Sequence, residues 1–224
     1  MKRKQSLEEF TDGRIYDYND MVKANTSDCK GCHLCCTGMG NSLILDPFDV
    51  NRIRLGLNIT LESLISTGKV ELTVADGCIL PCIKMAYGEE EACGFLNNEG
   101  RCSIHKYRPS ICRLFPLGRL HENGDFKFIL QTGECPKTDK AKIKVSKWID
   151  SPADRKYHDF ICKWHKLLID VESEVVKDPE CERSKMLNMV LLQYFYLNTY
   201  GEDFFSSFND KEEHFRKAVL NHYT

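Results

Sequence analysis

The chain has 224 residues, of which 42% are hydrophobic and 29% charged, and its formal net charge is −2. These proportions are typical of a globular protein and exclude an intrinsically disordered one. Charges of both signs are interspersed, so the chain lacks the basic surface that binds nucleic acids. No apolar run approaches the roughly 18 residues that a membrane span requires, so we expect no membrane association.

Twelve cysteines are the unusual feature of the composition, and ten of them lie between Cys29 and Cys135. The chemistry is therefore expected in the first two thirds of the chain. Residues 1–10 contain no apolar run of the kind that a secretory signal needs. We therefore expect a cytoplasmic protein, in which disulfides are disfavoured.

The elements expected before residue 147 are short. Asp46-Pro47 is typical of a helix start, and this helix should end near Gly56. A second helix should begin at Thr60 and stop at Gly68. Alternation and apolar runs predict strands over residues 43–45, 70–74, 79–85, 117–121 and 126–130.

Turn signals connect some of these elements. Asn123-Gly124 predicts a tight hairpin between the last two strands. Residues 98–100 suit a turn that brings Cys93 and Cys102 near each other, and Ser103 is expected to cap a short helix that ends at Pro109.

The remainder of the chain is expected to be helical, with starts at Ser151, at Asp178-Pro179 and near Glu202. Apolar residues at helical spacing, Met186 and Met189 among them, are interpreted as core. The predicted fold class is α+β, in which a small cysteine-rich metal-binding core with short strands and helices precedes a helical C-terminal region. The predicted segments are an arm (1–26), a cysteine-cluster domain (27–147) and the helical region (148–224).

The central motif is Cys-x-x-Cys-x-x-Cys-Cys, formed by Cys29, Cys32, Cys35 and Cys36. It could belong to a disulfide framework, a thiol redox site, or a metal or iron–sulfur site. A redox motif needs only two cysteines and would leave Cys35 and Cys36 unexplained. We therefore favour a metal or iron–sulfur site.

The spacing of Cys29, Cys32 and Cys35 equals that of the first three ligands in a ferredoxin-type run. Cys36 follows at once, and adjacent side chains in extended backbone point to opposite sides, so Cys35 and Cys36 are not expected to converge on one ion. Further ligands should come from the later cysteines. Eight thiols would serve two mononuclear sites, or one cluster with structural thiols left over. The candidate metal ligands are Cys29, Cys32, Cys35, Cys36, Cys93, Cys102, Cys112 and Cys135.

The remaining cysteines have simpler interpretations. Cys78 and Cys82 could be accessory ligands, but buried small hydrophobic residues are the favoured interpretation. Cys162 and Cys181 stand among apolar helical residues and are expected to pack there.

Histidine and arginine residues accompany the cysteines. His33 and His105 could ligate zinc, but a structural role is favoured because the thiols already suffice. Arg108 and Arg113 could stabilise thiolates or, equally, pair with acidic neighbours such as Glu99.

Three further segments of the sequence, taken with the first motif, resemble those of a known protein family. They are Cys93-Gly94-Phe95-Leu96, Cys102-Ser103-Ile104-His105 with Arg108-Pro109, and Cys112-Arg113-Leu114-Phe115-Pro116. With the first motif, they resemble the YkgJ-like cysteine-cluster family, described as a zinc- or iron-chelating domain, over about residues 29–135. Gly94 and His105 replace the proline and tyrosine usual in that family, and neither change removes a thiol.

The cysteine cluster is also similar to that of flagellin lysine N-methylase, a longer enzyme associated with an iron–sulfur cluster and methyl transfer from S-adenosylmethionine. This resemblance implies S-adenosylmethionine as a candidate cofactor, although no Gly-rich loop for a nucleotide-like cofactor is present. We expect a 4Fe–4S cluster ahead of zinc, and a protein substrate or redox partner.

Overall fold

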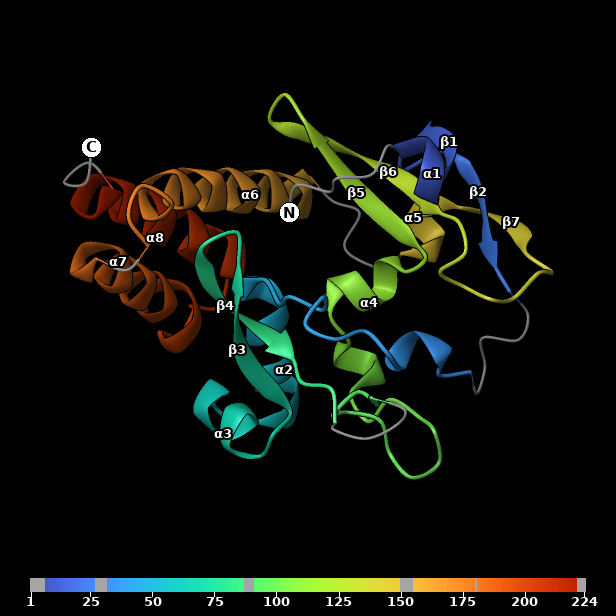
Figure 1. Cartoon of the computed structure of the whole chain (residues 1–224), viewed down its shortest axis with the longest axis horizontal. Coiled ribbons are helices and arrows are strands. Elements are labelled where there is room, and N and C mark those ends of the chain that lie inside the picture. The colour runs from blue at the N-terminus through green and yellow to red at the C-terminus, as the bar shows by residue number, and fades with distance from the viewer. Residues whose placement is uncertain (1–6, 27–31, 87–90, 150–154, 180, 221–224) are drawn as a thin grey trace. The chain divides into compact units, whose positions relative to one another are not determined.

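The computed structural model describes residues 7–26, 32–86, 91–149, 155–179 and 181–220 (Figure 1). Short strands and helices accompany the cysteines and helices dominate the C-terminal part, which confirms the α+β class. The chain divides into two compact units, each made of two stretches of sequence. Unit 1 is Met1–Leu43 with Ile83–Ala153, and unit 2 is Ile44–Cys82 with Asp154–Thr224. The predicted boundaries at residues 26/27 and 147/148 stay a prediction.

Unit 1 contains a three-stranded antiparallel sheet of order β1-β6-β5 (Figure 1). Its strands are β1 (Thr11–Tyr16), β5 (Leu117–Glu122) and β6 (Asp125–Gln131). Asn123 and Gly124, with φ of 51° and 79°, join β5 to β6. Positive φ at both residues suits a two-residue hairpin turn, so the predicted hairpin is confirmed.

The segment before residue 26 contributes a second strand pair to unit 1. Strand β2 (Met21–Asn25) pairs antiparallel with β7 (Ala141–Lys144), although more than 100 residues separate them. The short helices of this unit are α1 (Leu7–Phe10), α4 (Ser110–Leu114) and α5 (Val145–Trp148). Trp148 fastens α5 to the end of α4, because its indole N–H donates to the carbonyl oxygen of Phe115 at 3.1 Å.

Unit 2 begins with two capped helices, α2 (Pro47–Leu57) and α3 (Leu61–Ser66). The Asp46 carboxylate accepts from the amide of Asp49 at 2.8 Å, and the Thr60 hydroxyl accepts from that of Ser63 at 3.2 Å, which confirms both predicted starts. Helix α2 ends at Leu57, next to Gly56 as predicted, and its C-cap Asn58 lies in the left-handed region with φ of 54°.

A β-hairpin of strands β3 (Val70–Ala75) and β4 (Cys78–Ile83) follows α3 in unit 2. Its turn is Asp76-Gly77, with φ of 48° and 78°, a hairpin signal that the sequence analysis missed. The strand expected over residues 43–45 is reduced to one bridge between Ile44 and Cys82.

The C-terminal part of unit 2 consists of α6 (Arg155–Val175), α7 (Glu182–Leu192), a π-helical turn (Gln193–Leu197) and α8 (Phe204–Ala218). The start predicted at Ser151 lies outside the described residues. Helix α7 begins at Glu182 with Cys181 as its N-cap, later than predicted. Asp203 caps α8, close to the predicted start at Glu202.

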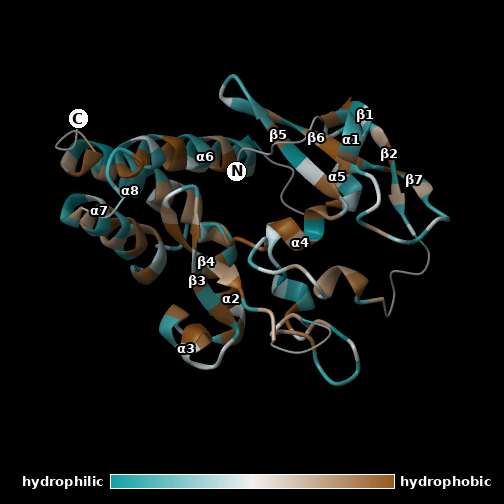
Figure 2. Ribbon diagram, viewed as in Figure 1, coloured by the Kyte–Doolittle hydropathy of each residue, from teal (hydrophilic) through white to brown (hydrophobic). Residues whose placement is uncertain are grey.

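Aromatic side chains form much of the core of unit 2. The Trp164 ring of α6 lies 5.3 Å from Phe195, which in turn lies 5.8 Å from Phe208 and 5.3 Å from Phe215 of α8. In Figure 2 apolar and polar residues alternate along α6, as expected of a helix with one buried face.

One prediction about α7 is wrong, because Met186 and Met189 are 57% and 69% exposed. Asn188 defines the buried face of α7 instead. Its side chain accepts from the amide of Ile79 at 2.8 Å and donates to the carbonyl oxygen of Gly77 at 3.1 Å. This pairing with the hairpin turns the methionines outward.

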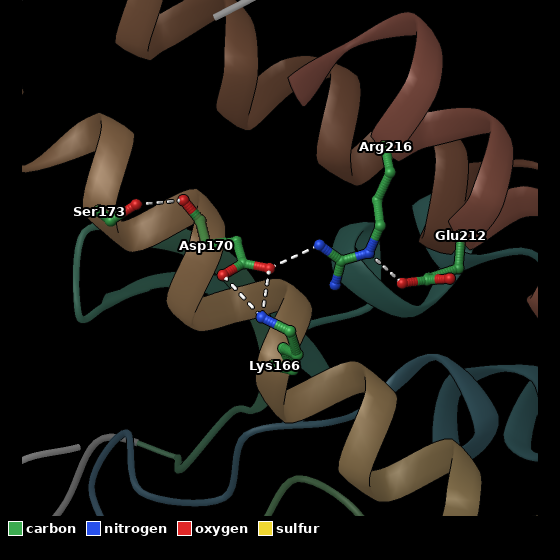
Figure 3. Close-up of polar contacts among 5 residues, drawn as sticks. All are labelled: Lys166, Asp170, Ser173, Glu212 and Arg216. Atoms are coloured by element: carbon green, nitrogen blue, oxygen red, sulfur yellow. Dashed lines mark hydrogen bonds and ion pairs between the residues drawn. The ribbon is translucent and has the colours of Figure 1, made fainter. Parts of the chain in front are cut away.

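An ion-pair network joins α6 to α8 (Figure 3). Arg216 lies 2.5 Å from Asp170 across the two helices and also binds Glu212, while Lys166 contacts Asp170 at 3.3 Å.

Among the helices that the structure describes, none is long and apolar enough to span a membrane.

Candidate metal centre

The first cysteine block lies in unit 1, and the structure describes it from Cys32 onward, so Cys29 lies outside the described residues. Leu34–Cys36 forms a 3-10 helical turn in which the Cys36 amide donates to the His33 carbonyl oxygen at 2.8 Å. The backbone is thus not extended here, and the thiols of Cys35 and Cys36 form a hydrogen bond with each other. The premise of an extended backbone at these two residues is therefore wrong, and whether their thiols converge on one ion stays a prediction.

Backbone hydrogen bonds hold the second cysteine block against the first. The Cys93 amide donates to the carbonyl oxygen of Cys36 at 2.8 Å, and the Gly38 amide donates to that of Glu91 at 3.2 Å. Between these bonds Thr37 and Ala92 form an antiparallel bridge. The chain therefore brings Cys36 and Cys93 together through its own backbone.

A tight turn then returns the chain from Cys93 to Cys102. The Asn97 amide donates to the Arg101 carbonyl oxygen at 2.8 Å, and Leu96 forms a bridge with Cys102. This is the turn that the sequence predicted. Ser103, however, does not cap the next helical turn (His105–Tyr107), since its hydroxyl donates to the Phe95 carbonyl oxygen at 2.9 Å.

The last part of this region presents Cys112 from α4. Helix α4 begins directly after Pro109, so Cys112 lies within a helix and not in the loop beyond one. The guanidinium of Arg113 is buried and donates to the carbonyl oxygens of Lys106 at 2.9 Å and Arg108 at 3.2 Å. Arg113 thus fixes the backbone before Cys112, a role that the sequence analysis did not foresee.

The electrostatics of the thiols show which cysteines lie near one another. The hydrogen bond from Cys36 lowers the pKa of Cys35 to about 7, and Arg108 acts in the same direction. The same hydrogen bond raises the pKa of Cys36, as do burial and the neighbouring Cys93 and Cys112. Among these neighbouring thiols, the lowered pKa of Cys35 favours its ionised form, whereas the raised pKa of Cys36 favours its neutral form.

Cys102 belongs to the same cluster. Burial raises the pKa of Cys102, and Cys35 adds to this effect, whereas Arg108 opposes it. Arg108 therefore acts on thiols from both cysteine blocks, which is the thiolate-stabilising interpretation of this residue. The Nε atom of Arg108 is buried and lacks a hydrogen-bond partner among the described residues.

Five of the eight predicted ligands are thus linked pairwise, since Cys35, Cys93 and Cys112 act on Cys36, and Cys35 acts on Cys102. Cys32 is half-buried just before the 3-10 turn, and Cys135 is half-buried in the loop after β6. The roles of Cys29, Cys32 and Cys135 as ligands stay predictions.

The donor chemistry of this cluster fits a thiophilic metal. Thiolates bind zinc and iron–sulfur clusters, and a neighbouring guanidinium compensates their negative charge. The Phe95 amide also donates to the sulfur of Cys93 at 3.4 Å, which orients that sulfur. Among the described histidine and cysteine residues of the two blocks, no three ligand atoms lie within 4.8 Å of one another.

The cysteines of unit 2 behave differently. Cys78 and Cys82 on β4 are 1% and 0% exposed, and burial raises their pKa values to about 12 and about 11. They are the small buried hydrophobic residues that we favoured. Cys181 caps α7, where its sulfur accepts from the Ser184 amide at 3.4 Å, while Cys162 lies half-buried on α6.

Comparison with known proteins agrees with this donor chemistry. A family model named CxxCxxCC, whose description reads "Putative zinc- or iron-chelating domain", matches residues 28–149. The match covers more than half of the chain and includes all eight candidate ligands. No curated protein and no solved structure matches the chain. The chain belongs to the CxxCxxCC family of zinc- or iron-chelating domains, and it is a metal-binding protein.

Proposed function

We propose that the protein holds a cysteine-ligated iron–sulfur cluster in unit 1, of the 4Fe–4S type. Its ligands are drawn from the eight candidate cysteines. The observation that carries this proposal is that the backbone joins Cys36 to Cys93 and Leu96 to Cys102, while the Cys112 thiol acts on that of Cys36, so that thiols from three separate segments gather in one region. No packing requirement explains such a meeting, because a core is built from larger apolar side chains.

The sequence spacing of the first block supports a cluster over a single zinc ion. Cys29, Cys32 and Cys35 have the same gaps as the first three ligands of a ferredoxin-type run. In a 4Fe–4S cluster each of the four thiolates binds a different iron atom.

The charge of the site also supports the proposal. Four thiolates give either centre a net negative charge, and Arg108 compensates part of it at Cys35 and Cys102. A bound 4Fe–4S cluster would supply one-electron transfer, redox sensing or Lewis-acid chemistry. The chain's own residues would hold it through their thiolates, donate the Phe95 N–H to the Cys93 sulfur, and exclude part of the solvent. A protein redox partner is the partner class that suits this function.

Zinc is the second candidate, because the family description names zinc beside iron. Cysteine-only zinc sites are structural, so a zinc ion would link the cysteine blocks and stabilise the fold. It would carry no electrons. The two candidates therefore differ in colour and in redox behaviour.

The experiment is anaerobic purification, followed by visible absorption and by analysis of iron, zinc and acid-labile sulfide per chain. We expect brown protein with iron and sulfide in equal amounts. Colourless protein with stoichiometric zinc would contradict the iron–sulfur cluster and support a structural zinc site. Absence of both metals after anaerobic reconstitution would refute the proposal.

S-adenosylmethionine-dependent methylation of lysine in another protein is a separate proposal, which depends only on the similarity of the cysteine cluster. It predicts saturable binding of S-adenosylmethionine to metal-loaded protein in a calorimeter. Absence of detectable binding there would remove the methylase from consideration.

A further inference from the structure

The imidazole of His33 lies against Gly100, in the turn that connects Cys93 to Cys102. A Cβ atom built on Gly100 would lie only 2.9 Å from Nδ1 and 3.1 Å from Cε1 of His33. Gly100 has a φ of +69°, which already favours glycine. Only glycine at position 100 therefore leaves room for the His33 ring. This contact links the first cysteine block to the second.

The polar groups of this turn are directed at Asn97 and not at the ring. The Gly100 amide donates to the Asn97 carbonyl oxygen at 2.9 Å. The amides of Glu99 and Arg101 donate to the Asn97 side-chain oxygen at 3.1 and 2.8 Å. These three donors are already engaged, so the turn does not supply a hydrogen bond to His33.

The Nδ1 atom of His33 is buried and has no hydrogen-bond partner within the described part of the chain. His33 precedes the 3-10 turn Leu34–Cys36, yet its side chain makes no capping hydrogen bond there. A buried polar atom without a partner is rare in folded proteins and is commonly explained by an ion or water that binds it. An imidazole nitrogen is a common zinc ligand and replaces cysteine in some iron–sulfur centres, and His33 stands between Cys32 and Cys35 in the sequence.

We propose that His33 is a ligand of the metal centre through Nδ1, in place of one of its four cysteine thiolates, and that Gly100 is required to accommodate its ring. This inference assumes the metal centre of the proposed function. It replaces one thiolate of the centre by a neutral nitrogen, which lowers the negative charge of the ligand set and, for a cluster, raises its reduction potential. His33 would then be the residue that distinguishes this centre from one with thiolate ligands alone.

The test is the ligand set of the bound metal. For zinc we would record X-ray absorption at the metal edge, where nitrogen ligands appear at about 2.0–2.1 Å and sulfur ligands at about 2.3 Å. For an iron–sulfur cluster we would record pulsed EPR of the reduced protein, labelled with ¹⁵N-histidine. The expected result is one directly bound histidine nitrogen in the wild-type protein.

Three variants complete the test. His33→Phe retains a flat ring and should abolish the nitrogen signal, and Gly100→Ala should abolish or weaken it by displacing the ring. Gly13→Ala is the matched control, because Gly13 has a φ of +72° and no atom within 4 Å of an added Cβ, so it should keep the signal.

The outcomes separate this inference from the proposed function. An all-sulfur ligand set in metal-loaded wild-type protein would overturn the role of His33 and leave the cysteine centre intact. An unchanged nitrogen signal in His33→Phe would overturn it as well. Wild-type protein that binds neither iron nor zinc would overturn both. The wild-type spectrum decides the matter even where a variant does not fold.

Discussion

The backbone amide of Cys93 lies 2.8 Å from the carbonyl oxygen of Cys36 and donates a hydrogen bond to it. This contact, with the neighbouring bridge between Thr37 and Ala92, joins two cysteine blocks that are far apart in the sequence, and it uses main-chain atoms alone. Because the blocks are already in contact, a metal ion or cluster needs to order less of the chain when it binds. The fold of unit 1 therefore prepares the site that its thiols complete.

Replacement of Cys112 by serine should release most of the bound metal and lower the thermal stability of unit 1, since metal binding at such sites is coupled to folding. Cys162→Ser is the control, with an expected loss of about 1 kcal/mol or less and unchanged metal content. Metal per chain and the unfolding midpoint are the measurements. Equal metal content in both variants would show that Cys112 is not a ligand.

The core of unit 2 depends on a buried tyrosine. The Tyr196 hydroxyl donates to the carbonyl oxygen of Leu45 at 2.9 Å, and both residues are buried. Tyr196→Phe leaves that oxygen without its donor and should lower the free energy of unfolding by about 1–3 kcal/mol. Tyr194→Phe, the same change at a half-exposed position of the same π-helical turn, should cost less. Urea unfolding would contradict this prediction if the two variants were equally stable.

Tyr196 also predicts an alkaline limit to stability. Burial raises the pKa of Tyr196 well above its ordinary value of 10.0. The folded protein therefore keeps the proton that the unfolded chain loses, so this contribution is complete below pH 10 and is lost as the pH rises above it. The wild-type protein should lose stability more steeply between pH 10 and 11 than Tyr196→Phe. Parallel pH profiles would contradict this account.

The network of Figure 3 should contribute modestly to the packing of α6 against α8. Arg216 and Asp170 are only 28% and 30% exposed at their side chains. Arg216→Met should lower the free energy of unfolding by about 1 kcal/mol, an effect reduced in high salt. Lys217→Met, which removes the exposed pair with Glu213, should have little effect. Equal losses in the two variants would show that the partly buried pair has no special role.

The sequence predicted best those features that local chemistry determines. Asp46 before a proline, Thr60 before an apolar stripe, and Asn123-Gly124 between alternating segments each act on neighbouring backbone, and each lies where expected. The cysteine blocks were equally visible, since so many thiols at such spacing favour a metal site over a disulfide framework or a redox pair. Local pattern was therefore enough for these features.

Long-range pairing explains what the sequence did not reveal. Strand β2 has only five residues, and its partner β7 follows more than 100 residues later. The exposed methionines of α7 depend on which face Asn188 presents to the hairpin, and both faces carry apolar residues. At the site, the contact of His33 with Gly100 joins two blocks whose relative position only the folded chain defines.

The most direct test of the central claim is cysteine labelling followed by mass spectrometry, on the metal-loaded protein and after anaerobic metal removal. We predict that the ligand thiols, drawn from Cys35, Cys36, Cys93, Cys102 and Cys112, become reactive together when the metal leaves. Cys78 and Cys82 should stay protected until the protein unfolds, because they are buried and their pKa values are raised to about 12 and about 11. Equal reactivity of those five thiols with and without bound metal would contradict the claim that they meet at one metal centre.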